Sequence, residues 1–203
     1  MTALRWAMLA GLALVAAPAA ARDSVPTNWR NVVAEHDAIS LRNTRQAWID
    51  ALAKARAGGA GARIAAEGAL FDFDRAQPKV KLPVGEYRCR VFKLGAKAAG
   101  NLDFVAYPWA HCQVTADGPL THLTKLDGAQ RQDGRLYDDG TARQVFLGTL
   151  ALADETKWLT YGRDTLRDVA GMVERVGPAR WRIAIPYPKF ESMLDVIELV
   201  PAS

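Results

Sequence analysis

Three histidines are the residues of this chain best suited to metal binding or to proton transfer near neutral pH: His36, His111 and His122. The dipeptide Asp117-Gly118 predicts a two-residue hairpin turn, which places His122 opposite Gln113. His111 and His122 would then lie diagonally on one face of the hairpin, within reach of one metal ion. A metal site needs a third ligand, and the sequence places none beside them. We therefore predict no metal centre, and His111 and His122 are the residues to inspect for one.

Carboxylates form a second set of candidates, because a pair of them can exchange protons with a substrate. Three pairs stand close together in the sequence: Asp154 with Glu155, Asp164 with Asp168, and Glu191 with Asp195. Adjacent residues of a strand point to opposite sides, and the second pair stands beside arginines that can neutralise it. The nucleophile motif GxSxG is absent from the sequence. The sequence thus assigns no catalytic residue and no cofactor, and an enzyme, such as a metal-assisted hydrolase, is kept as an alternative.

The two cysteines, Cys89 and Cys112, are better explained as a disulfide than as nucleophiles. An even number of cysteines favours a bridge in an exported protein. Each cysteine alternates with apolar residues in a predicted strand, and pairing of the two strands would bring the sulfur atoms together. A link across 23 residues contributes about 3–4 kcal/mol in the chain-entropy model. Two buried free thiols are the alternative, whereas a CxxC pair and a cysteine zinc site are excluded by spacing and number.

Aromatic side chains are the third group, and they would bind a ligand rather than transform it. Tyr107 and Trp109 share one face of a predicted strand, and Trp181 and Tyr187 alternate with isoleucines in another segment. Packing in the core is the simpler explanation of such residues. If small neighbours such as Ala110 leave space, the same four aromatic residues would line a site for a small apolar ligand. Tyr107, Trp109, Trp181 and Tyr187 are therefore the predicted ligand-binding residues.

The elements that must position these residues change in type along the chain. Apolar residues recur at three- and four-residue steps over 35–57, which predicts an amphipathic helix ending at Gly58-Gly59. A shorter helix over 62–70 follows, and two prolines predict an irregular connector over 72–85. From Gly85 the apolar residues alternate with period two. Nine short strands are expected there: 85–94, 104–116, 120–127, 130–137, 142–152, 157–161, 168–176, 180–186 and 194–200.

Strands this numerous, joined mostly by tight turns, predict an α+β fold in which the N-terminal helix pair precedes an antiparallel up-and-down β-barrel of the lipocalin-like kind. A two-sheet β-sandwich is the alternative. The residues Gly177-Pro178-Ala179 are expected to form a three-residue loop that pairs Val176 with Arg180 and Glu174 with Arg182, because this register matches charges best. The expected parts are a signal peptide (1–21), a helical segment with its connector (22–84) and the barrel (85–203).

The first 21 residues have the layout of a secretory signal peptide, with Arg5 before an apolar run and Ala19-Ala20-Ala21 before the expected cleavage position. The apolar run over 6–17 has 12 residues, whereas a membrane-spanning helix needs about 20. We expect a periplasmic or secreted protein with no membrane span after cleavage. The formal net charge is only +4, and basic and acidic residues are interspersed, which argues against nucleic acid as a partner.

Long strings of this chain are similar to a known family. They are "QAWIDALAKARAGG", "GEYRCRVFKLGAK", "FVAYPWAHC", "VFLGTLALADET" and "YGRDTLRDVAGMVERVGPARWRIAIPYPKFESMLDVIELVP". They resemble a family of exported bacterial proteins, domain of unknown function 4893, over nearly the whole mature chain. The resemblance implies a bacterial and periplasmic protein, but it implies no activity, substrate or catalytic residue.

The function expected from these observations is a non-catalytic binding or accessory module, with a small apolar ligand or an envelope protein as its partner. An envelope structural or interaction protein with a filled barrel is the first alternative, and an enzyme with an unrecognised site is the second. A cavity inside the barrel would favour binding, and a packed interior would favour the structural protein.

Overall fold

The computed structural model describes residues 25–203, so the predicted signal peptide over 1–21 lies outside the described residues. The helices come first: α1 (Glu35–Arg42), α2 (Thr44–Ala55) and α3 (Gly61–Ala66). Short helical turns accompany them at Trp29–Asn31, Arg56–Ala60, Gly68–Phe71 and Phe73–Arg75. Nine strands follow: β1 (Gly85–Ala96), β2 (Phe104–Ala106), β3 (Ala110–Asp117), β4 (Leu120–Lys125), β5 (Gln130–Asp138), β6 (Gln144–Leu152), β7 (Asp168–Gly177), β8 (Arg180–Pro186) and β9 (Ser192–Pro201).

The helix expected over 35–57 is two helices, because Asn43 ends α1. The side-chain amide of Asn43 donates to the carbonyl oxygen of Ile39 at 3.0 Å, which satisfies a group that the helix end leaves free. Helix α2 ends at Ala55, before the expected end at Gly58-Gly59. A wide helical turn over Arg56–Ala60 follows, in which Gly59 has a φ of +84°. Glycine adopts this left-handed conformation without steric cost, and the chain turns directly into α3.

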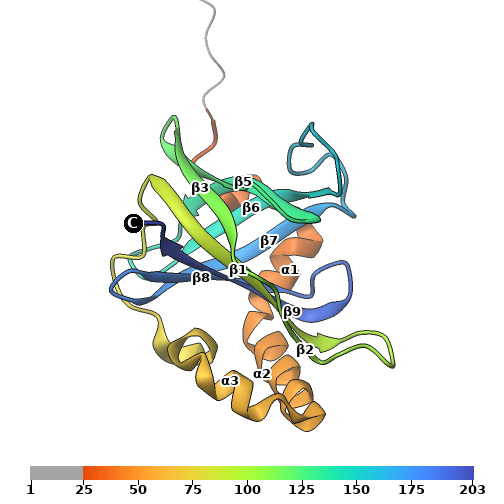
Figure 1. The fold of residues 1–203 in the computed structure, drawn as a ribbon. Coiled ribbons are helices and arrows are strands. Elements are labelled where there is room, and N and C mark those ends of the chain that lie inside the picture. The colour runs from red at the N-terminus through yellow and green to blue at the C-terminus, as the bar shows by residue number, and fades with distance from the viewer. Residues whose placement is uncertain (1–24) are drawn as a thin grey trace, which may run out of the picture.

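The strands form one antiparallel sheet in the order β2-β1-β3-β4-β5-β6-β7-β8-β9, and β1 also pairs with β9. The pairing of the first and last strands closes eight strands into a barrel, which confirms the predicted α+β barrel and excludes the sandwich (Figure 1). The short strand β2 lies beside the second half of β1 as an additional strand. No helix in the described part of the chain is long and apolar enough to cross a membrane.

Two of the predicted strands were wrong. The strand expected over 104–116 is interrupted at Tyr107-Pro108-Trp109, because Pro108 has no N–H group with which to continue the ladder. The segment 157–161 is not a strand but part of the connection between β6 and β7. These two strands pair directly with each other, and their other edges are occupied by β5 and β8, so no edge remains for an additional strand between them.

The β7–β8 hairpin has the predicted register in its body and a different turn. Glu174 pairs with Arg182, as expected from the charge pattern. At the end of the hairpin, however, Gly177 rather than Val176 pairs with Arg180. The turn therefore has two residues, and a bulge at Val176 takes up the extra residue of the strand.

The two ends of the barrel differ in their connections. At one end β3, β5 and β7 pass into β4, β6 and β8 through the short segments 118–119, 139–143 and 178–179. We call this the closed end, because Leu82, Tyr87 and Trp181 are buried there and Trp181 Nε1 donates to the carbonyl oxygen of Val80 at 2.8 Å. At the other end, the open end, the connections are 97–109, 126–129, 153–167 and 187–191.

The barrel interior is apolar and tightly filled over the closed half. The disulfide Cys89–Cys112 lies inside it and joins the neighbouring strands β1 and β3, with a Cα–Cα distance of 5.8 Å, so the predicted bridge is confirmed. The ring of Phe146 lies inside this closed half of the barrel, and Gly148 leaves room for it. A Cβ atom on Gly148 would lie 2.5 Å from Cζ of Phe146.

The helices cover the outside of the barrel. Helix α2 lies against the strands β1, β8 and β9, and α3 lies beside α2 (Figure 1). Trp48, Leu52 and Ile64 of these helices pack with Phe92 and other outward-facing apolar residues of the barrel. Helix α1 lies over β7. A buried arginine of β8, Arg182, fastens the segment after α3 to the barrel through hydrogen bonds to its carbonyl groups.

Candidate functional site

The inward-facing side chains change from apolar to polar as the strands approach the open end. Along β1 the apolar residue Val91 is followed on the same face by Lys93, and along β4 Leu123 is followed by Lys125. Gln132 of β5 and Asp195 of β9 occupy corresponding inward positions. All four polar side chains belong to buried residues. Because buried charges and amides are costly without partners, their presence here marks this half of the barrel as the candidate site.

Lys93 is neutralised by two carboxylates. Its Nζ atom lies 2.8 Å from Oε2 of Glu191 and 3.5 Å from Oδ2 of Asp195. Burial alone would lower the pKa of Lys93, but the two carboxylates outweigh it, so the pKa is raised and the ammonium form is favoured. Burial raises the pKa of Asp195, whose Oδ1 atom also accepts a hydrogen bond from the hydroxyl of Ser192. Lys93 therefore carries a charge that is already compensated.

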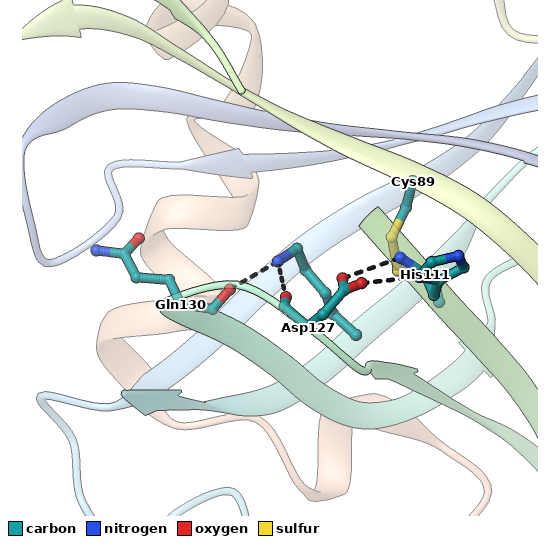
Figure 2. The surroundings of a disulfide bond; sticks show 6 residues. Cys89, His111, Asp127 and Gln130 are labelled. Atoms are coloured by element: carbon teal, nitrogen blue, oxygen red, sulfur yellow. Dashed lines mark hydrogen bonds and ion pairs between the residues drawn. A yellow bond between two sulfur atoms is a disulfide. The ribbon is translucent and has the colours of Figure 1, made fainter. Parts of the chain in front are cut away.

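Lys125 is held differently, because its ammonium group donates to backbone carbonyl oxygens. The acceptors are the oxygens of Asp127 and of Gln130, the latter at 3.1 Å. No carboxylate oxygen of the described residues lies within 4.0 Å of its Nζ atom. The nearby Asp127 carboxylate is engaged by His111, through its backbone N–H and its ring, and Figure 2 shows Asp127 between His111 and Gln130. Burial lowers the pKa of Lys125, as expected for a cation without a full counter-charge.

Beside Lys125 the open end holds a cavity of about 510 Å³. Lys93, Lys125 and Gln132 line it from inside the barrel, and Tyr107 and Trp109 line it from the connection that follows β2. The Oε1 atom of Gln132 is buried, and no described residue donates a hydrogen bond to it. A cavity of this size accommodates a small molecule, and the amide oxygen and the ammonium group offer it an acceptor and a cation.

The connections of the open end carry most of the exposed large hydrophobic residues. Ten large hydrophobic residues are exposed in the described part of the chain, and seven of them belong to the four connections of this end. They are Leu102, Tyr107, Trp109, Leu126, Leu159, Leu166 and Phe190. Exposed apolar side chains that gather around a cavity mark a binding surface, whereas single ones scattered over a protein need no explanation.

The predicted ligand-binding aromatic residues are divided between the two ends of the barrel. Tyr107 and Trp109 line the open-end cavity, and Tyr187 lines a smaller hollow beside it. Trp181 is buried at the closed end, where its ring meets Tyr87 edge-on at 6.2 Å between centroids. The structure thus brings three of the four residues to one end and uses the fourth in the packed core.

The histidine pair expected on one hairpin is not brought together. The β3–β4 turn is Gly118-Pro119 rather than Asp117-Gly118, so His122 lies opposite Thr115 instead of Gln113. His111 pairs with Asp127 at 2.8 Å, and His122 pairs with Asp133 at 2.9 Å. The shift of two residues separates the two rings along the strands, and each ring binds its own carboxylate.

Two of the three carboxylate pairs of the sequence do not act on a common partner. Glu155 forms a two-fold hydrogen-bonded ion pair with Arg167, and Asp168 lies beside Asp37 of α1. Only Glu191 and Asp195 share a partner, which is Lys93.

Sequence reasoning missed Lys93, Lys125 and Gln132. A signal for Lys93 was present, because it continues the face that carries Tyr87, Cys89 and Val91 in steps of two. A lysine at the end of a predicted strand is normally taken as solvent-exposed, and only closure of the barrel decides that this face points inward.

Comparison with known proteins identifies the family of this chain. No curated protein and no solved structure gives a significant match to the chain. Residues 29–199, which include the helices α1, α2 and α3 and nearly the whole barrel, match the family described as domain of unknown function (DUF4893), and the chain therefore belongs to that family.

Proposed function

We propose that this protein is a binding module that holds one small amphipathic molecule with an acidic group in the open end of its barrel. The observation that supports this most strongly is Lys125, a buried ammonium group to which no carboxylate of residues 25–203 is paired, at the wall of a cavity of about 510 Å³. A bound carboxylate would supply the missing counter-charge, and charge-assisted hydrogen bonds of this kind are among the stronger ones.

The remaining features of the cavity support the same class of ligand. The Oε1 atom of Gln132, which has no hydrogen-bond donor within the described part of the chain, would accept a hydrogen bond from a hydroxyl or N–H group near the acidic end. Tyr107 and Trp109 would contact an apolar body that extends toward the rim. The ligand is therefore an apolar molecule with one anionic end, rather than the purely apolar molecule that the sequence suggested.

The filled-barrel alternative agrees with only half of the interior. Phe146, Trp181 and their neighbours fill the closed end, and this half would serve a structural protein equally well. The polar, hollow half would lower the stability of a purely structural barrel, because buried polar groups without partners are destabilising. Binding thus explains both halves, with the closed half as the rigid support of the site.

We propose further that binding takes place outside the cytoplasm. The signal-peptide pattern of residues 1–21 supports this location, and the disulfide is compatible with it. Fractionation of cells that express the full chain, followed by mass measurement, tests the point. A processed protein in the periplasm or medium would support export, and an unprocessed protein in the cytoplasm would contradict it.

The test of binding uses the anionic apolar dye 1-anilinonaphthalene-8-sulfonate and the Lys125→Met variant. Methionine keeps much of the apolar stem of lysine and removes the charge, so the affinity for the dye should fall about tenfold or more if the sulfonate meets Lys125. Lys81→Met, at an exposed lysine near the closed end, should leave the affinity unchanged. Equal affinities for the wild type and Lys125→Met, or no saturable binding, would contradict the proposed site.

A further inference from the structure

A second cluster of polar residues lies on the outside of the barrel, where α1 crosses β7. His36 and Asp37 belong to the first turn of α1, and Asp168 is the first residue of β7. One potential ligand atom from each of the three residues lies within 4.8 Å of the other two. A nitrogen atom and two carboxylate oxygens thus converge from two elements that are distant in the sequence.

Each carboxylate of the cluster has one oxygen held by a protein donor. The hydroxyl of Tyr161 donates to Oδ2 of Asp37 at 2.6 Å and itself accepts from the backbone N–H of Ala34 at 3.0 Å. The backbone N–H of Gly162 donates to Oδ1 of Asp168 at 2.9 Å. These bonds fix the orientation of both carboxylates, as outer contacts do for the ligands of metal ions.

The other oxygen of Asp168 has no such donor. Asp168 is only 4% exposed, and its Oδ2 atom is buried without a hydrogen-bond partner among the described residues. The Nε2 atom of His36 is also buried and unpartnered by hydrogen-bond geometry, although it lies 3.0 Å from Oδ1 of Asp37. Buried polar atoms without partners are rare, and here two of them belong to one cluster.

The electrostatics of the cluster favour a cation. Asp37 and Asp168 are both buried, and each presents a carboxylate oxygen within 4.8 Å of the other, so their two negative charges repel each other. A positive ion between the carboxylates would remove this repulsion. Asp37 and Asp168 also line a hollow of about 30 Å³, which has room for water that could complete the coordination of an ion.

We propose that His36, Asp37 and Asp168 bind one divalent transition-metal ion, with Tyr161 and Gly162 as positioning groups. Imidazole nitrogen together with carboxylate oxygen suits Zn²⁺ or Mn²⁺ better than Ca²⁺, which prefers oxygen ligands alone. Metal ligands bind in their deprotonated forms, so a neutral imidazole and two carboxylates would offer the ion a net charge of −2. The ion would join α1 to the first residue of β7 and, through Tyr161 and Gly162, to the connection 153–167.

The test uses the full chain without an affinity tag, so that added histidines do not bind the metal. After incubation with Zn²⁺ and dialysis, elemental analysis should find one equivalent of zinc, and the melting temperature should be higher than that of the metal-free protein. Asp168→Asn should weaken zinc binding at least 100-fold. The asparagine oxygen still accepts from Gly162 and the buried charge is removed, so this variant should fold and melt no lower than the metal-free wild type.

A matched control separates this site from the other histidine–carboxylate pairs. His111→Ala, which removes the ring that pairs with Asp127, should retain one equivalent of zinc. Loss of zinc in His111→Ala but not in Asp168→Asn would overturn the assignment, and so would the absence of bound zinc from the wild type. Equal affinity for Ca²⁺ and Zn²⁺ would overturn the role of His36.

Discussion

The guanidinium group of Arg182 donates two hydrogen bonds to Oε2 of Glu174, at 2.9 Å from Nε and 2.7 Å from Nη2, across the β7–β8 hairpin. Arg182 is fully buried, and its other N–H groups donate to carbonyl oxygens of Leu70, Asp72 and Phe73. Its guanidinium carbon also lies 4.5 Å from the ring centroid of Trp48. One side chain thus connects the hairpin, the segment after α3 and helix α2.

Replacing this arginine should destabilise the protein strongly. Arg182→Met keeps the bulk of the side chain but leaves the buried Glu174 without its main partner and several carbonyl groups without donors. Breaking a buried ion pair from one side typically costs about 3–5 kcal/mol. Urea unfolding measures this loss, and Arg163→Met, at an exposed arginine, should change stability by less than about 0.5 kcal/mol. Similar curves for the two variants would show that Arg182 has no structural role.

The disulfide should contribute substantially to stability. A bridge between Cys89 and Cys112 constrains 23 residues of the unfolded chain, which corresponds to about 3–4 kcal/mol in the chain-entropy model. The double variant Cys89→Ala/Cys112→Ala should melt roughly 10 °C below the oxidised protein. A reducing agent should leave the melting temperature of this variant unchanged, which makes it the control for reduction of the wild type. Equal melting temperatures of the variant and the oxidised protein would contradict the prediction.

Gly148 should not tolerate a larger residue. In Gly148→Ala the new Cβ atom would lie 2.3 Å from the carbonyl oxygen of Asp133 and 2.5 Å from Phe146 Cζ, so backbone or core must shift. Overpacking of this kind costs about 1–3 kcal/mol. Gly61→Ala is the matched control with the opposite sign. Gly61 begins α3 with no atom close to its missing Cβ, and alanine should stabilise the helix by up to about 1 kcal/mol.

The ion pair of Glu155 and Arg167 predicts a pH dependence of the connection 153–167. The hydrogen bonds from Arg167, and then one from the backbone N–H of Leu152, lower the pKa of Glu155 to about 2 from the usual 4.5. Since the pKa is lower in the folded state, the contribution of this pair is fully present above pH 4.5 and is lost as the pH falls toward 2. NMR titration of the Glu155 carboxyl carbon measures the midpoint. In Arg167→Gln it should rise toward the usual value, and an unchanged midpoint would show that Arg167 does not hold the carboxylate.

Much of the barrel was predictable from local patterns. Of the nine segments expected from the alternation of apolar residues after Gly85, eight coincide with strands, and one of these eight merges β2 with β3. The opposed charges of Glu174 and Arg182 fixed the register of a hairpin. The errors occurred where a single residue or turn determines where a strand or helix ends. Pro108 interrupts a strand, Asn43 ends a helix, and a turn at Gly118-Pro119 shifts a hairpin by two residues. Such shifts preserve the apolar face, so the pattern alone does not detect them.

The candidate sites were less predictable, because they depend on closure and on contacts between distant elements. Lys93 and Lys125 occur in alternating strands whose inward face is decided only when β1 meets β9. His36 and Asp168 meet because α1 lies over β7, and no spacing in the sequence expresses that contact. The cysteines were predictable because few residue types have so strong a preference for one partner.

The pairing of β1 with β9 has a consequence for how the chain reaches its native state. The two strands that complete the barrel are its first and its last, so the ladder between Gly85–Ala96 and Ser192–Pro201 can form only after almost the entire polypeptide has been synthesised. Until then β1 and β8 each present an edge to which another chain could add. A nascent or truncated chain that ends before Ser192 is therefore the species most at risk of self-association.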